Sequence, residues 1–320
     1  MKYYIGIDLG GTNTVSGVVN EEYKIVGIGK VKTQAKISSE VIADGMAESA
    51  RLAVADAGIT MENVEWIGVG TPGIADFDTG YVEYSCNLSL LHTPLAEMIE
   101  QRLGKKTYLA NDADAAAYGE YIAGAAQGVA NMIAITLGTG VGGGIIINHK
   151  LYSGFNHAGG ELGHMGIVYN GRPCGFGIKG CLEAYASATG LVNLTKESMQ
   201  AHRDSKMWEI AGSLDNVNGR TAFDGMRAGD EAAKQVVDEY IRYLGYGLVN
   251  FVNIFQPEIL CIGGGISKEG ETLLAPLREI LKRESYGSSQ TQPTKLVAAQ
   301  LGNNAGIIGA AFLGKMKSGK

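Results

Sequence analysis

The chain has 320 residues, a formal net charge of −6, 45% hydrophobic residues and 19% charged residues. This composition fits a globular protein of about two domains and excludes disordered and fibrous classes. The acidic balance argues against nucleic-acid partners, and no apolar run approaches the roughly 20 residues that span a bilayer. With only four cysteines and no signal-peptide pattern before a first strand at Tyr3, we expect a cytoplasmic protein.

The first elements in chain order are short strands joined by glycine-rich turns. Residues 3–9 are apolar and partly β-branched, which predicts a buried strand. Gly10 and Gly11 end this strand, residues 14–19 alternate as a returning strand, and residues 25–31 predict a third. The chain therefore opens as a strand meander.

Helices and strands then alternate as far as residue 121. The first helix has Ser38 or Ser39 as its cap and Gly58 as its stop signal. The predicted segments are a helix over 40–57, a strand over 66–69, a helix over 92–103, a strand over 107–110 and a helix over 112–121. This alternation is typical of an α/β domain.

The opening pattern of strand, Gly-Thr turn and strand recurs in the middle of the chain. Residues 132–140 repeat the pattern of residues 5–12, and residues 144–147 form the next strand. The repeat predicts a duplicated architecture. The predicted domains are an N-terminal α/β domain over 1–120, to which a helix over 303–320 returns, and a C-terminal α/β domain over 121–302.

The second half of the chain contains the most strongly periodic helix. Residues 230–255 carry an apolar stripe at helical spacing, and Pro257 follows. A strand over 258–262 runs into Gly263, Gly264 and Gly265, and a last helix covers 305–315.

Three glycine-rich turns, each after a predicted strand, are candidates for binding phosphate. Glycine lets the backbone approach a phosphate closely, and consecutive N–H groups can hold the anion. The alternative for each turn is an ordinary glycine hairpin. The candidate residues are Asp8, Gly10, Gly11, Thr12 and Asn13 in the first turn, Gly138, Thr139 and Gly140 in the second, and Gly263, Gly264 and Gly265 in the third. Asp8 is also a candidate for holding Mg²⁺ through water.

Asn111 and Asp112 follow a predicted strand and begin a helix. Ligands of open α/β sheets bind at the carboxyl ends of strands, so Asp112 could accept the proton of a substrate hydroxyl. The alternative is a helix cap, which either residue could provide. Both roles can coexist if Asn111 is the cap.

These residues together resemble the ROK family of repressors and sugar kinases, within the actin-like and hexokinase-like ATPases. The most specific stretch is Gly159–His164, with Cys174 and then Gly180–Glu183. The resemblance implies a two-domain, duplicated, actin-like α/β fold, related to ribonuclease H, with a cleft between the domains. It also implies that Asp112 is the general base and that the glycine turns bind ATP. The sugar-binding positions it implies are Gly73, Asn87, Asn111, Glu161, His164 and Glu183.

Two positions depart from the family pattern. Asp114 stands where the family usually has Asn, and its effect on sugar choice stays open. The family's zinc site would use His164, Cys174 and Cys181, but Phe176 replaces the middle cysteine. Structural zinc takes four ligands, so zinc is doubtful here, and we expect Phe176 to fill the space by apolar packing.

The resemblance implies an ATP- and Mg²⁺-dependent hexose kinase, with glucose as the first choice and phosphorylation at the 6-hydroxyl. N-acetylmannosamine, N-acetylglucosamine, fructose and allose stay open as substrates, and so does polyphosphate as donor. A non-catalytic sugar-sensing regulator is the alternative of another class. A repressor would carry a helix-turn-helix domain ahead of Tyr3, for which we expect no room. We expect a homodimer, with a tetramer as the alternative.

Overall fold

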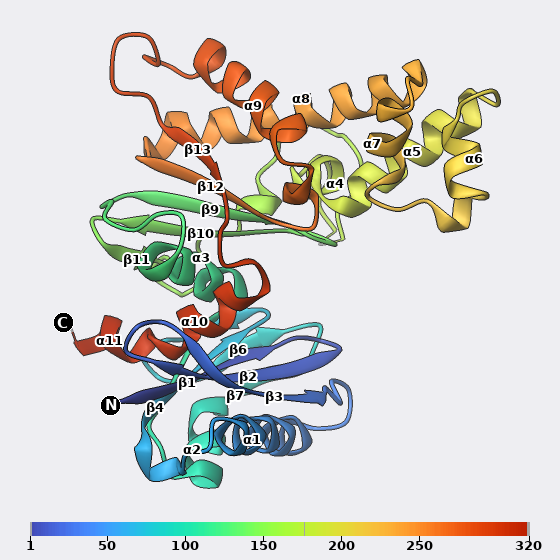
Figure 1. Cartoon of the computed structure of the whole chain (residues 1–320). Coiled ribbons are helices and arrows are strands. Elements are labelled where there is room, and N and C mark those ends of the chain that lie inside the picture. The colour runs from blue at the N-terminus through green and yellow to red at the C-terminus, as the bar shows by residue number, and fades with distance from the viewer. Residues whose placement is uncertain (1, 176, 319–320) are drawn as a thin grey trace. The chain divides into compact units, whose positions relative to one another are not determined.

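A computed structural model describes residues 2–175 and 177–318, and the chain divides into two compact units (Figure 1). Unit 1 comprises Met1–Ala130, Gly144–Gly160 and Gln300–Lys320, and unit 2 comprises Asn131–Gly143 and Glu161–Ala299. The units differ from the predicted domain limits at residues 121–130, 144–160 and 300–302. The helix that begins at Asp112 continues to Ala123, so unit 1 extends past residue 120. The limits of the domains remain a prediction.

Unit 1 contains a five-stranded sheet with the order β3-β2-β1-β4-β8. Strands β1, β2 and β3 form an antiparallel meander, and β4 and β8 continue the sheet in parallel with β1. The predicted strands of this unit are confirmed, with somewhat wider limits. They are β1 (Tyr3–Leu9), β2 (Asn13–Asn20), β3 (Ile25–Lys32), β4 (Val64–Thr71) and β8 (Thr107–Asn111).

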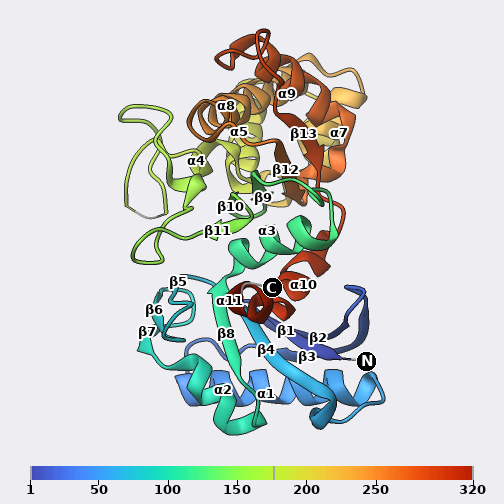
Figure 2. The same ribbon diagram turned by 90° about the vertical axis from the view of Figure 1, so that its left-hand side faces the viewer.

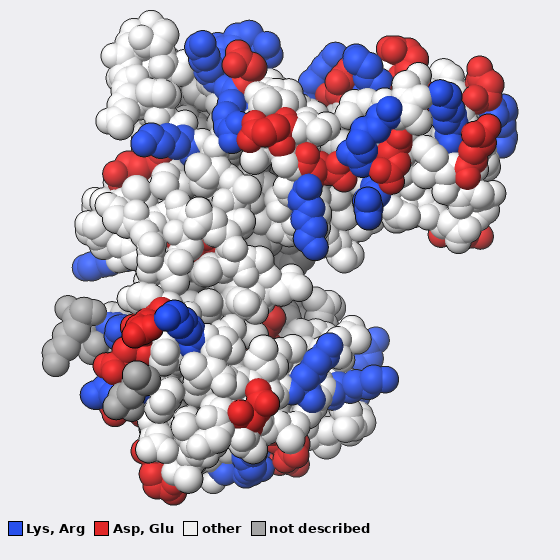
Figure 3. All heavy atoms as spheres, viewed as in Figure 1, with Lys and Arg blue, Asp and Glu red and all other residues white. Residues whose placement is uncertain are grey.

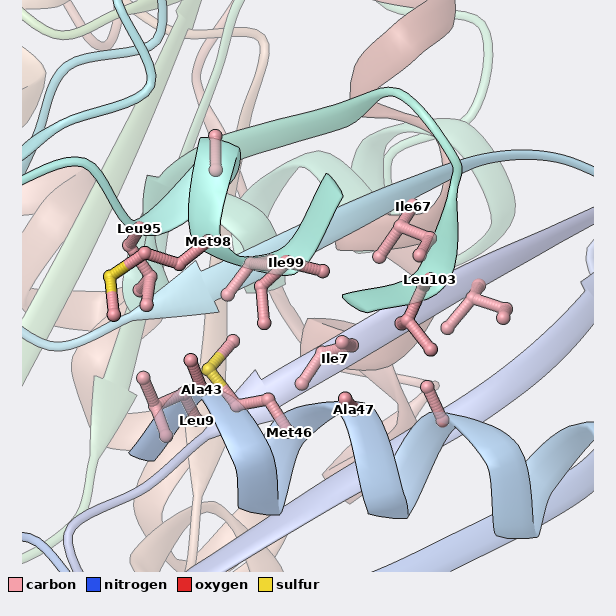
Figure 4. Packing of buried hydrophobic residues seen from close by; sticks show 14 of the residues in the cluster. Ile7, Leu9, Ala43, Met46, Ala47, Ile67, Leu95, Met98, Ile99 and Leu103 are labelled. Carbon is pink, nitrogen blue, oxygen red and sulfur yellow. The ribbon is translucent and has the colours of Figure 1, made fainter. Parts of the chain in front are cut away.

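Helices cover both faces of this sheet (Figure 2). On one face lie α1 (Ser39–Asp56) and α2 (Leu95–Leu103), and on the other lie α3 (Asp112–Ala123) and α10 (Ala305–Ala311). Figure 4 shows Ile7 of β1, Met46 of α1 and Ile99 of α2 meeting in the buried cluster between them. On the opposite face α10 comes so close that a Cβ at Gly6 would lie 1.8 Å from the carbonyl oxygen of Ile307.

A small antiparallel sheet was not expected from the sequence. It consists of β5 (Ile74–Ala75), β6 (Val82–Ser85) and β7 (Leu90–Thr93). The prediction of a helix from residue 92 was therefore wrong at its start. Because residues 90–93 pair with β6, the helix begins only after Pro94.

A second five-stranded sheet has the order β11-β10-β9-β12-β13. Its strands, counted in chain order, follow the same sequence of positions as those of the first sheet, which confirms the predicted duplication. Strand β12 is parallel to both β9 and β13. The strands are β9 (Met132–Leu137), β10 (Val141–Ile147), β11 (Lys150–Tyr152), β12 (Ile259–Gly264) and β13 (Lys295–Ala298).

Unit 2 carries the longest helix of the described residues, α8 (Glu231–Phe255), as predicted. The Asp230 side chain caps it by accepting hydrogen bonds from the backbone of Ala232 and Ala233. The other helices of this unit are α4 (Glu183–Ala186), α5 (Ala188–Ala201), α6 (Met207–Ala211), α7 (Thr221–Arg227) and α9 (Glu271–Glu284). Over these helices, Figure 3 shows basic and acidic side chains interspersed.

The last predicted helix, over 305–315, is divided at Phe312 into α10 and α11 (Leu313–Ser318). Phe312 is completely buried, and its ring lies 4.8 Å from that of Tyr4 and 4.7 Å from that of Tyr23. Packing of this side chain accounts for the interruption. No helix among residues 2–175 and 177–318 has both the length and the apolar character needed to span a bilayer.

Candidate active site

Two aspartates lie at the carboxyl ends of strands in the sheet of unit 1. Asp8 of β1 pairs in register with Gly70 of β4, which in turn pairs with Ala110 of β8. Asp112 follows two residues later, so only β4 separates the strands that carry the two acids. This edge of the sheet is where open α/β sheets bind ligands.

The pKa values of both aspartates are raised. Burial raises the pKa of Asp8 to about 6, and the charge of Asp112 adds to that shift. Surrounding protein atoms also raise the pKa of Asp112, although its side chain is open to solvent and accepts a hydrogen bond of 2.8 Å from the backbone of Ala113. No donor among the described residues hydrogen-bonds the Asp8 carboxylate. A half-buried carboxylate without a donor suits a cation, so Asp8 fits the predicted magnesium site.

Asn111 is the cap of α3, one of the two alternatives drawn from the sequence. Its Oδ1 accepts hydrogen bonds from the backbone N–H groups of Ala113 at 2.8 Å and Asp114 at 3.4 Å. Its Nδ2 donates to the carbonyl oxygen of Gly73 at 3.0 Å. Because Asn111 supplies the cap, Asp112 occupies the first helical position with its carboxylate available for chemistry.

The predicted sugar positions of unit 1 lie on neighbouring segments. Gly73 has a φ of 97°, and a Cβ there would lie 2.1 Å from the carbonyl oxygen of Tyr84 in β6. The turn after β6 exposes Asn87. The Asn111 contact thus links the end of β8 to Gly73, and Gly73 in turn packs against the strand that leads to Asn87.

The first glycine turn joins β1 to β2. Gly10 donates its N–H to the carbonyl oxygen of Asn13 at 3.0 Å, and Thr12 accepts a backbone bond from Thr33 at 3.0 Å. A Cβ at Gly11 would meet no atom within 4 Å, so this part of the turn is open. The turn is a hairpin, as the alternative predicted, with an exposed tip that a phosphate could approach.

The second and third glycine turns follow adjacent parallel strands of unit 2. Gly263 pairs with Thr136, and Gly264 pairs with Leu137. Gly264 has a φ of 89°, and a Cβ there would lie 2.4 Å from the carbonyl oxygen of Leu137. The close approach of the two backbones therefore requires glycine at position 264.

Protein donors hold the carbonyl oxygens of the second turn. Ala188 donates its N–H to Gly138 O at 2.8 Å, the Thr189 hydroxyl donates to Thr139 O at 2.7 Å, and Gly138 donates to Gly140 O at 3.0 Å. Because Gly138 uses its N–H within the turn, the N–H groups of Thr139 and Gly140 are the candidate donors to an anion. The supporting residues Ala188 and Thr189 were not foreseen, because they lie about 50 positions away in the sequence.

Glu183 lies directly against the second turn. Its Oε2 accepts the N–H of Val141 at 3.0 Å, and a Cβ at Gly140 would lie 2.2 Å from that oxygen. Its Oε1 lies 3.8 Å from the sulfur of Cys174. A predicted sugar ligand and a predicted phosphate turn are thus adjacent in unit 2.

The remaining predicted sugar ligands of unit 2 extend this group. The Nδ1 of His164 lies 3.5 Å from the sulfur of Cys174, and its Nε2 lies 4.0 Å from Glu161 Oε2. His164 and Glu183 therefore each contact Cys174, and Glu161 is linked to Cys174 through His164. Carboxylate and imidazole groups so placed can accept and donate hydrogen bonds to the hydroxyls of a sugar.

Three of the expected zinc ligands come together. The ligand atoms of His164, Cys174 and Cys181 all lie within 4.8 Å of one another. Burial, followed by the hydrogen bond with Cys174, raises the pKa of Cys181 to about 11. The described residues supply three donors of the four that structural zinc takes, so the fit is incomplete. Phe176, for which apolar packing was predicted, lies outside the described residues.

One neighbour of Asp8 was missed. Gly306, in the first turn of α10, lies so that a Cβ built on it would be 3.8 Å from the carboxyl carbon of Asp8. The sequence predicted that this helix returns to the N-terminal domain, but not that Gly306 lies beside Asp8.

Comparison with known proteins decides the family, since the ROK family model matches residues 4–317. The chain belongs to the ROK family. Glucokinase of Thermotoga maritima is 38% identical over 317 residues, which are 98% of each chain. The crystal structure of a ROK family glucokinase from Streptomyces griseus in complex with glucose and AMPPNP matches with a TM-score of 0.83 and 38% identity, and covers 97% of this chain and 98% of the other.

The ROK family also includes regulators. The xylose repressor of Caldicellulosiruptor bescii is 31% identical, and the match covers 95% of this chain and 76% of the repressor. The expected fold class, the duplicated actin-like α/β ATPase fold, is confirmed by the family match and the glucokinase structure. The predicted roles of single residues remain proposals.

Proposed function

We propose that this ROK family member is an ATP-dependent glucokinase that phosphorylates the 6-hydroxyl of glucose, with Asp112 as the general base. The observation that carries this proposal is the position of Asp112, whose accessible carboxylate follows strand β8 at the first position of α3. Phosphoryl transfer needs precise positioning and a base that accepts the hydroxyl proton. Asn111 leaves Asp112 available by capping the helix in its place.

Glucose is bound by residues that suit a polyol. Asn111 and Asn87 contribute amides, Glu161 and Glu183 contribute carboxylates, and His164 contributes an imidazole. A site built for such hydroxyls rejects analogues that lack them by large factors. The glucokinase from Streptomyces griseus was crystallised with glucose, which supports glucose over the other hexoses of the family.

ATP is held by the backbone of the three glycine turns. AMPPNP, a nonhydrolysable analogue of ATP, in the same related structure supports this donor. Mg²⁺, when bound near Asp8 through water, would offset the charge of the β- and γ-phosphates. Asp8 contributes an ionised carboxylate at the end of β1. The described residues supply three of the four ligands that structural zinc takes, so zinc is not part of this proposal. The homodimer is a prediction from the sequence.

A substrate screen tests the proposed function. The purified chain is assayed for ADP release with ATP-Mg²⁺ and glucose, N-acetylmannosamine, N-acetylglucosamine, fructose or allose, with polyphosphate as the alternative donor. We expect the highest kcat/KM with glucose and ATP. If the chain binds glucose in calorimetry but releases no ADP, it is a sugar-sensing regulator and the proposal fails.

A further inference from the structure

His157 joins two segments of unit 1 that lie far apart in the sequence. Its Nε2 lies 3.1 Å from Oδ1 of Asp76 and 4.0 Å from Oδ2 of Asp78. Its Nδ1 lies 3.4 Å from the hydroxyl of Ser153. Because both ring nitrogens have partners, the orientation of the imidazole is fixed on both sides.

The segment around His157 is folded back on itself. Gly159 donates its N–H to the carbonyl oxygen of Ser153 at 2.8 Å, which closes residues 153–159 into a loop. His157 itself has a φ of 58°, a left-handed conformation that side chains other than glycine adopt rarely. The contacts of the imidazole with Asp76 and Ser153 can offset part of this backbone cost.

The surroundings of Asp76 favour its ionised form. Burial would raise the pKa of Asp76, but hydrogen bonds from Thr79 and Asp78 and the charge of His157 together lower it. The aspartate is therefore ionised at neutral pH. The side chains of His157 and Asp76 are only 20% and 17% exposed, so solvent competes less for this contact than for one between exposed side chains.

The joined segments adjoin predicted sugar ligands. Gly73, whose carbonyl oxygen accepts from Asn111, precedes Asp76 by three residues, and Glu161 follows His157 by four. We propose that His157 is a positioning residue for the sugar site, which holds the turn after Gly73 and the loop before Glu161 together. This inference rests on the proposed function, because it assigns His157 to the binding of the same sugar.

Three variants test the inference. His157→Gly removes the ring and releases the left-handed backbone, and Asp76→Asn keeps the oxygen that accepts the backbone bonds of the turn but removes its charge. The third is the double variant. The matched control is His149→Gly, because His149 also has a positive φ of 66° and a ring bond, 2.7 Å to the Tyr121 hydroxyl, but adjoins no predicted sugar ligand.

We expect His157→Gly to raise the KM for glucose by about three- to thirtyfold, with kcat and the KM for ATP changed by less than about twofold. Asp76→Asn should act in the same direction, and the double variant should be no worse than the more severe single variant, because both remove one contact. If His157→Gly moves the KM for glucose no more than His149→Gly does, the ring is merely structural and the inference is overturned. A fall in kcat at unchanged KM would overturn it as well.

Hydrogen exchange separates this inference from the proposed function. In His157→Gly, amide exchange should become about tenfold faster in peptides covering 74–80 and 153–160, but not in the His149→Gly control. A wild-type chain without kinase activity would end the proposed function and leave this exchange result to decide whether the imidazole joins the two segments. Unchanged exchange in both segments would overturn the inference even in an active kinase.

Discussion

Asp8 lies in β1 and Asp112 follows β8, with only β4 between these strands, and the charge of Asp112 helps to raise the pKa of Asp8 to about 6. Each acid must be ionised to act, Asp8 toward a cation and Asp112 as a base. The two groups interact, so an acid limb in the pH profile would belong to the pair and not to either residue alone.

Kinase activity should therefore fall on the acid side of neutrality. A raised pKa means that the inactive protonated form persists to higher pH than in an ordinary aspartate. We expect kcat/KM for glucose to be constant above about pH 7 and to fall as the pH drops through about 6, because the Asp8–Asp112 pair then takes up a proton. Initial rates from pH 5 to 8 at saturating Mg²⁺ check this. A profile that stays flat down to pH 5 would show that neither acid titrates as the structure implies.

Replacement of Gly264 by alanine should destabilise the third glycine turn. The added Cβ would lie 2.4 Å from a backbone oxygen of Leu137, at a φ of 89°. The control is Gly229→Ala, which has a φ of 80° but no atom within 4 Å of the new Cβ. We expect Gly264→Ala to lose about 1–3 kcal/mol more unfolding free energy than the control, since the backbones must separate.

Urea unfolding measures this difference, and the KM for ATP should rise only in Gly264→Ala. Equal losses in the two variants would mean that the conformation of the glycine, and not the approach of β9, sets the requirement at position 264.

Glu120 should be important for stability although it lies outside the site. Glu120 is only 3% exposed. Its carboxylate accepts hydrogen bonds from the backbone N–H groups of Ala125, Gln300 and Leu301 at 2.9, 3.1 and 2.7 Å. Glutamine cannot reproduce this charge and these acceptors. We expect Glu120→Gln to lower the unfolding free energy by about 1–3 kcal/mol. The exposed Glu48→Gln serves as the control in thermal unfolding, and equal melting temperatures for the two variants would contradict this assignment.

The purified protein should contain much less than one zinc ion per chain. Only three donors are present among the described residues, and backbone bonds already shape the loop, since Gly180 donates to Arg172 O at 2.8 Å and accepts from Ile167 at 2.8 Å. A chelator should then leave the melting temperature unchanged. Phe176→Cys, which restores the family pattern, should bind about one zinc by elemental analysis. One full equivalent of zinc in the wild type would show that three protein ligands suffice.

Local sequence signals predicted most of the elements. The caps Ser38 and Asn111 and the stop at Gly58 set the ends of their helices to within a residue or two. The failure at residues 90–93 came from pairing with β6, which depends on a partner strand that local propensity does not reveal. Phe312 interrupted the last helix for the same kind of reason, because it packs on rings near the start of the chain.

The site was predicted as residue types but not as contacts. Local patterns predicted Asp8 as a magnesium residue and Asp112 as a base, and the ROK resemblance added Glu183 as a sugar ligand. The bond from Val141 to Glu183 crosses 42 positions of sequence, and no local pattern encodes it. The contact between His157 and Asp76 is equally non-local, so no local pattern encodes it either.

The most direct test of the proposed mechanism is the turnover of Asp112→Asn with glucose and ATP-Mg²⁺, measured beside glucose binding by calorimetry. Asparagine keeps the shape of the side chain but cannot accept the hydroxyl proton. We predict that kcat falls by about 10²–10⁴-fold while the dissociation constant for glucose stays within about threefold of wild type. A variant that turns over at the wild-type rate would contradict the assignment of Asp112 as the base.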